Sequence, residues 1–107
     1  MIDKIKIGPI EYWVEFKKNL QTPSGDDLYG CVKFAESAIH IEAHMGHQRQ
    51  RVTVLHEVIH AMFDQCGIPE MEEHIASMSF SMLALLKDNP KFVAWVVEDA
   101  GDARQTP

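Results

Sequence analysis

The chain has 107 residues, a formal net charge of −6 and a hydrophobic fraction of 46%. This length is enough for one domain with its own core, and we expect that domain to span residues 1–100. The acidic balance without a basic patch argues against a nucleic-acid partner, because proteins meet phosphates with clustered lysine and arginine.

The first half of the chain is expected to form strands. Apolar and polar side chains alternate over residues 10–17, which predicts a strand with one buried face, beginning after a turn at Gly8-Pro9. A loop rich in turn residues follows, and two further strands are expected at residues 28–34 and 38–44. One face of the last strand carries Ile39, Ile41 and Ala43.

The second half is expected to form helices. From about Val52 the apolar residues recur at helical spacing, and this helix should end near Cys66, because a glycine and a proline follow it. A second helix is expected over residues 70–87. A third should begin at Pro90, with Asn89 as its N-cap.

These elements predict an α+β fold. A small, mostly antiparallel sheet of three or more strands should pack on the first helix, and the second helix should close over it. Residues 101–107 are expected to form a disordered tail. Cys31 and Cys66 show no metal-binding spacing and are expected to be reduced thiols. No apolar stretch approaches the ~20 residues of a membrane span and no signal peptide is recognisable, so we expect a cytoplasmic protein.

The most informative stretch is VLHEVIHAMF, residues 54–63, which places polar groups inside an apolar run. His56 and His60 are one helical turn apart on the same side, so both imidazoles can be directed to one point, as tetrahedral Zn²⁺ requires. Glu57 is offset by ~100° and can take a proton from water activated by the metal. The alternative is two partly solvated histidines on a helix flank. The apolar neighbours favour the metal, because buried polar groups persist when paired or metal-bound.

A third ligand is needed, because a catalytic zinc usually takes three protein ligands and a water. Glu72 is preferred, since it is in phase with the apolar stripe of the second helix that should face the first. Glu73 lies on the flank of that stripe. Helix phase alone discriminates between them, so the alternatives stay open at the start of this helix: Glu70, Glu73 and His74.

The stretch TVLHEVIHAMFDQCGIPEMEEHIASMSFSMLALLKDNPKFV, residues 53–93, resembles the compact, phage-associated branch of the ImmA/IrrE-like metallopeptidases. The resemblance implies a gluzincin-like zinc site in which a glutamate on the next helix completes the coordination, and Glu72 followed by Ile75 fits that pattern best. The larger members carry an E-A-N-x-F-A run and a helix-turn-helix domain, and this chain has neither. The cleavage of a repressor is therefore not implied.

The resulting hypothesis is a zinc-dependent metallopeptidase with an unidentified polypeptide substrate. His56, His60 and Glu72 would hold Zn²⁺, and Glu57 would act as general base. An extended substrate is expected to pair with the strand Ile39–Ala43, the expected edge of the sheet. A second donor to the oxyanion is expected from one of four residues: His40, His44, His47 or Tyr29.

Two other functions stay open on the sequence alone. The first is a phage-encoded zinc-binding module that interacts with or inhibits a partner without proteolysis. The second is a metal-dependent hydrolase of a different substrate. Glu57 favours an enzyme over a binding module, because a purely structural zinc site has no use for an adjacent carboxylate.

Overall fold

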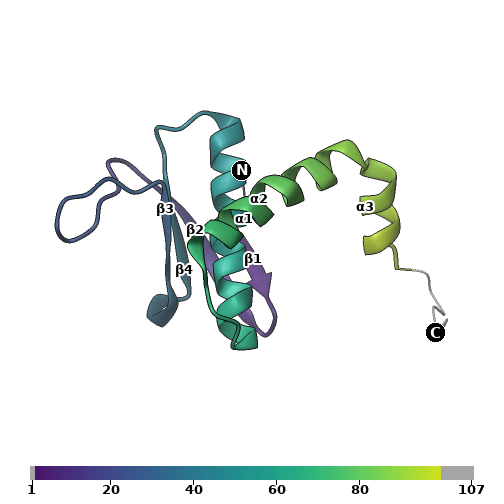
Figure 1. The fold of residues 1–107 in the computed structure, drawn as a ribbon, viewed down its shortest axis with the longest axis horizontal. Coiled ribbons are helices and arrows are strands. Elements are labelled where there is room, and N and C mark those ends of the chain that lie inside the picture. The colour runs from purple at the N-terminus through teal and green to yellow at the C-terminus, as the bar shows by residue number, and fades with distance from the viewer. Residues whose placement is uncertain (1, 100–107) are drawn as a thin grey trace.

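A four-stranded sheet from the first half of the chain carries the helices of the second half in the computed structural model, which describes residues 2–99 (Figure 1). This architecture confirms the predicted α+β class. The expected tail at residues 101–107 and the expected domain end at residue 100 lie outside the described residues. The strands are β1 (Lys4–Ile7), β2 (Ile10–Lys17), β3 (Gly30–Lys33) and β4 (Ala38–Glu42).

The strands are arranged in the order β1-β2-β4-β3. The pairs β1–β2 and β3–β4 are antiparallel, whereas β2 and β4 run parallel. The prediction that Ile39–Ala43 is the edge strand is therefore wrong, because β4 has a partner on each side. Ile39 and Ile41 are fully buried, as expected of a central strand. The edge on this side of the sheet is β3, which follows from the non-local pairing of β2 with β4.

The N-terminal strand β1 was not predicted, because its four residues are too short to show a periodic pattern. Gly8 has φ 58°, a conformation that glycine adopts without strain, and it closes the hairpin between β1 and β2. The Gln65 amide donates a hydrogen bond of 2.7 Å to the Ile7 carbonyl oxygen, which ties this hairpin to the first helix.

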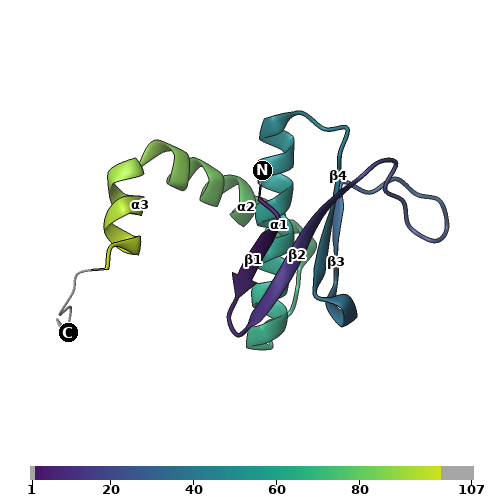
Figure 2. The same cartoon turned by 180° about the vertical axis from the view of Figure 1, so that it is seen from behind.

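The first helix, α1 (His47–Cys66), packs across one face of the sheet, as the view from behind shows (Figure 2). It begins at His47 and not near Val52. The prediction missed the first turn because this turn is largely solvent-exposed and carries no apolar stripe. It ends where predicted, with Gly67 in the left-handed conformation. The strands and α1 share a core of buried residues: Ile7, Tyr12, Val14, Ile39, Ile41, Val54 and Ala61.

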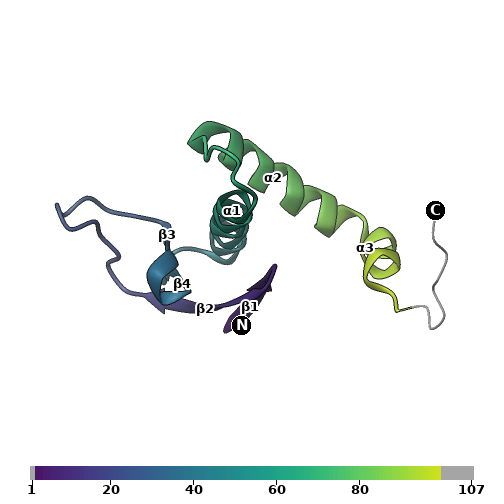
Figure 3. The ribbon, with the colours of Figure 1, turned by 90° about the horizontal axis from the view of Figure 1, so that it is seen from below.

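Two further helices follow, α2 (Glu72–Asp88) and α3 (Pro90–Val97). The first half of α2 packs on α1, while its second half extends away and carries α3 (Figure 3). At the corner between α2 and α3, the side-chain amide of Asn89 donates a hydrogen bond of 2.9 Å to the Leu85 carbonyl oxygen. This side chain therefore caps the C-terminal end of α2 and makes no capping hydrogen bond to α3. None of the helices within residues 2–99 is long and apolar enough to cross a membrane.

Candidate metal centre

Two of the three histidines of α1, His56 and His60, lie side by side at the surface between α1 and the start of α2. The ring centroids of His56 and His60 are 5.0 Å apart, and their side chains are 19% and 16% exposed. Both rings are therefore largely desolvated but still reach the surface. This arrangement follows directly from their spacing of four residues on one helix.

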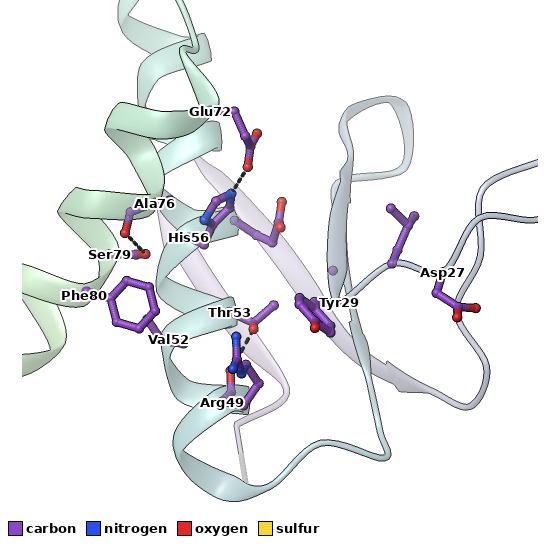
Figure 4. A pocket seen from close by; sticks show the side chains of 13 residues that line it. Asp27, Tyr29, Arg49, Val52, Thr53, His56, Glu72, Ala76, Ser79 and Phe80 are labelled. Carbon is purple, nitrogen blue, oxygen red and sulfur yellow. Dashed lines mark hydrogen bonds and ion pairs between the residues drawn. The ribbon is translucent and has the colours of Figure 1, made fainter.

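Glu72, the first residue of α2, completes a cluster with these histidines, and Figure 4 shows its contact with His56. One carboxylate oxygen contacts Nε2 of His56, and the other lies 2.9 Å from Nε2 of His60. One donor atom from each residue lies within 4.8 Å of the other two. Two imidazole nitrogens and a carboxylate oxygen are a donor set that suits zinc, so these three residues could hold a metal ion. The alternatives Glu73 and His74 are exposed and are not part of this cluster.

Glu70 does not lie in the second helix, where the sequence predicts it. The second helix begins at Glu72 and not at Glu70, which therefore lies in the connection between α1 and α2. Its carboxylate lies 2.9 Å from Nδ1 of His60. A proton on Nδ1 donates to Glu70, and this hydrogen bond leaves Nε2 free to accept a metal ion. No periodic pattern could have indicated this role, because Glu70 is not in a helix.

The pKa of His60 is raised above its usual 6.5. Burial lowers this pKa, but the hydrogen bond that the ring donates to Glu70 and the charges of Glu57 and Glu72 outweigh the effect of burial. The ring is thus surrounded by negative charge. A divalent cation bound at Nε2 would neutralise the same charges that favour a proton there.

We expect Glu70→Gln to weaken zinc binding by about 10–100-fold, the usual effect of removing a carboxylate that orients a metal-bound histidine. The measurement is competition for zinc against a chromophoric chelator. Glu73→Gln is the matched control, because it removes the same charge from an exposed neighbouring position. Equal affinities for both variants would contradict the proposed orientation of His60.

Glu57 is the one acidic residue of the site that is buried, with 6% of its surface exposed. Its carboxyl group lines both cavities beside His56 and His60, so the oxygen atoms are not sealed from solvent although most of the residue is buried. Burial raises the pKa of Glu57 to about 7, an effect that the nearby His60 opposes and the charge of Glu72 reinforces. A carboxyl group with this pKa can accept and release a proton near neutral pH.

A trough runs along β3 on both sides of the histidine–glutamate cluster. Two cavities of about 370 Å³ each form it. They share Leu28, Gly30, Glu57 and Glu72. The first is continued by Tyr29, Arg49 and Phe80 (Figure 4), and the second by Cys31, Phe34 and His60.

Of the four proposed oxyanion donors, the structure places one in this trough. Tyr29 lies in it and is 61% exposed, with the Arg49 guanidinium 5.3 Å from its ring centroid. His40, His44 and His47 line neither half of the trough. Arg49 was not considered from the sequence. It lies seven residues, about two helical turns, before His56, so the two side chains lie on the same side of α1.

Gly30 allows α1 to approach the edge strand. A Cβ atom here would lie 2.8 Å from Cγ2 of Thr53 and 3.2 Å from a carboxylate oxygen of Glu57. Any side chain at this position would therefore push β3 away from α1. The neighbouring Cys31 is a free thiol, as is Cys66, which is what the sequence predicts.

Converging donors, an adjacent proton acceptor and an open trough are together the parts that metal-assisted hydrolysis of an extended ligand needs. All of them come from α1, the start of α2 and the edge of the sheet. Comparison of the chain with protein-family models, curated proteins and solved structures finds no match.

Proposed function

We propose that this chain is a zinc-dependent peptidase of the compact, phage-associated kind that its HExxH segment resembles. The observation that carries the proposal is the position of Glu57, a largely buried residue whose carboxyl group lines the cavities beside a cluster that could hold a metal ion. In a structural metal site this carboxyl group would only cost stability, because burying an acidic group is unfavourable.

His56, His60 and Glu72 would hold the ion, and Glu70 would orient His60. Zinc bound in such a site supplies a Lewis acid that activates water and polarises a carbonyl group. Glu57 accepts the proton that the attacking water loses and delivers it to the leaving amine. Its pKa is about 7 in the metal-free protein, and a bound divalent cation would lower it, so the group would be ionised and able to accept a proton at neutral pH.

The trough supports an extended polypeptide as the substrate. Within the sheet, β3 pairs only with β4, so its outer edge offers unpaired backbone groups. A peptide that pairs with this edge would pass the cluster with residues in both cavities. Tyr29 would then be positioned to donate to the oxyanion, because it lies in the same cavity as His56 and Glu57.

The experiment is metal analysis combined with a cleavage assay on the full chain. After zinc loading and dialysis we expect about one zinc per chain, and we expect cleavage in a diverse peptide library, read by mass spectrometry. A chelator should abolish cleavage, and added zinc should restore it. His74→Ala is the matched control for His60→Ala, because His74 is exposed and outside the cluster.

The outcomes separate the candidate functions. Less than a tenth of an equivalent of zinc after loading would contradict the metal site itself. Zinc at full occupancy without cleavage in the library would favour the non-proteolytic binding module. Cleavage that survives the chelator would point to chemistry other than the one proposed.

A further inference from the structure

The last turn of α2 and the whole of α3, residues 85–97, form an apolar arm that extends from the rest of the molecule (Figure 3). No residue of α3 is buried, although Lys91 is the one charged residue of this helix and apolar side chains occupy most of its surface. A helix of eight residues is unstable without packing, and one that is apolar all round is normally covered. The exposed apolar residues of the arm are Leu85 (44%), Leu86 (38%), Phe92 (45%), Trp95 (68%), Val96 (56%) and Val97 (73%).

The apolar surface of this arm is at the upper limit of what a monomer usually leaves in contact with water. Its six exposed residues present roughly 600 Å², the upper end of the largest patch on typical monomers. A membrane surface is a poor match, because the chain is acidic and the arm carries few basic residues for anionic lipids. The arm therefore calls for a protein surface with an apolar groove.

The chain itself carries such a groove, lined by α1, by β2 and by Leu83 of α2. It has a volume of about 680 Å³ and lies apart from the trough, with which it shares no lining residue. Its floor is apolar, with Phe16, Val54, Leu55 and Leu83, and its rim carries His47 and Arg51.

We propose that the arm of one copy occupies the groove of a second copy, so that two chains form a symmetric dimer. The acidic residues Glu98 and Asp99 directly follow α3 and complement the basic rim formed by His47 and Arg51. Each subunit would contribute both its arm, with roughly 600 Å² of exposed apolar surface, and its groove, which approaches the ~800 Å² per partner of a standard stable interface. The exchange is self-complementary and therefore closes after two copies.

The corner between α2 and α3 favours packing of the arm in the groove of a second copy over packing in the groove of its own chain. Asn89 bonds to the Leu85 carbonyl oxygen, and Pro90 occupies the first position of α3. These features hold α3 turned away from α2. Folding back onto Leu83 of the same chain would break this corner. Because the trough stays outside the interface, the dimer does not depend on the proposed peptidase activity.

The test is sedimentation velocity of the full chain from about 1 to 200 µM. The wild type should be a dimer at the upper end of this range. Trp95→Glu should raise the dissociation constant about 30-fold or more, the effect of removing a central aromatic residue from an interface. Trp13→Glu is the matched control, because Trp13 is also exposed (52%) but lies in β2, away from both arm and groove.

A charge reversal identifies the surface against which the arm packs. Arg51→Glu alone should weaken the dimer about tenfold, and Arg51→Glu combined with Glu98→Arg should restore most of the affinity. Circular dichroism of each variant checks that the fold is kept. A wild type that is monomeric over the whole range overturns the proposal, and so does a dimer that Trp95→Glu and Arg51→Glu leave unchanged.

Discussion

Glu57→Gln should slow peptide cleavage by about 10²–10⁴-fold, the usual effect of removing a general base. The substitution keeps the shape of the side chain and removes its ability to accept a proton. Zinc content should stay near one per chain, because Glu57 is not among the three clustered donors. The measurement is the rate of cleavage of one peptide from the library by equal amounts of zinc-loaded wild type and variant.

Two results would contradict this role for Glu57. If the variant cleaves as fast as the wild type, the proton acceptor is another group. If the variant loses zinc, Glu57 is itself a ligand, and the cluster is of a different kind. Glu73→Gln serves as the matched control, since it makes the same chemical change on the exposed side of α2.

The stability of the metal-free protein gives a second readout of the same variant. The pKa of Glu57 is about 7 in the folded protein against an ordinary value of 4.5, so the folded state holds this proton more tightly than the unfolded chain. The free energy of unfolding should therefore fall as the pH rises from about 4.5 to about 7, by up to about 3 kcal/mol.

His60 contributes in the same direction, because its raised folded pKa adds stability that is lost above its usual 6.5. Glu57→Gln should remove most of the pH dependence and leave the part that comes from His60. The metal-free variant should consequently be more stable than the wild type at pH 8 and similar to it near pH 4. Urea denaturation in the presence of a chelator measures both profiles.

Glu72→Ala should weaken zinc binding by more than the 10–100-fold expected for Glu70→Gln, because it removes a ligand and not an orienting group. Its carboxylate contacts both histidines, as no other carboxylate within residues 2–99 does. Glu73→Ala should leave zinc affinity unchanged and shift stability by no more than ~0.5 kcal/mol. Competition against a chelator measures the affinities. If Glu73→Ala proves the more damaging, Glu73 is the ligand and the side of α2 that faces α1 is not the one described.

The local parts of the site could be predicted from the sequence. The spacing of His56 and His60 fixes their relation within one helix, whatever the helix packs on. Glu72 could be preferred over Glu73 because the buried residues Ile75 and Ser79 mark the side of α2 that faces inward.

The parts that depend on distant segments could not be predicted. The parallel pairing of β2 with β4 makes β3 the edge strand, and the alternation of residues within a strand says nothing about its neighbours. Glu70 orients His60 from an irregular connection, where neither helical nor strand periodicity applies. The start of α1 at His47 escaped prediction because its polar first turn lies largely outside the core.

Gly30 carries no reactive group, yet the proposed catalytic geometry depends on it. A glycine is often required because its backbone has a positive φ, and Gly8 and Gly67 are examples, with φ of 58° and 69°. Gly30 is required for a different reason, which is space: a single methyl group at this position would collide with Thr53 and Glu57. A survey of substitutions along this chain should therefore find a position on the sheet at which function is lost although every ligand and the base remain in place.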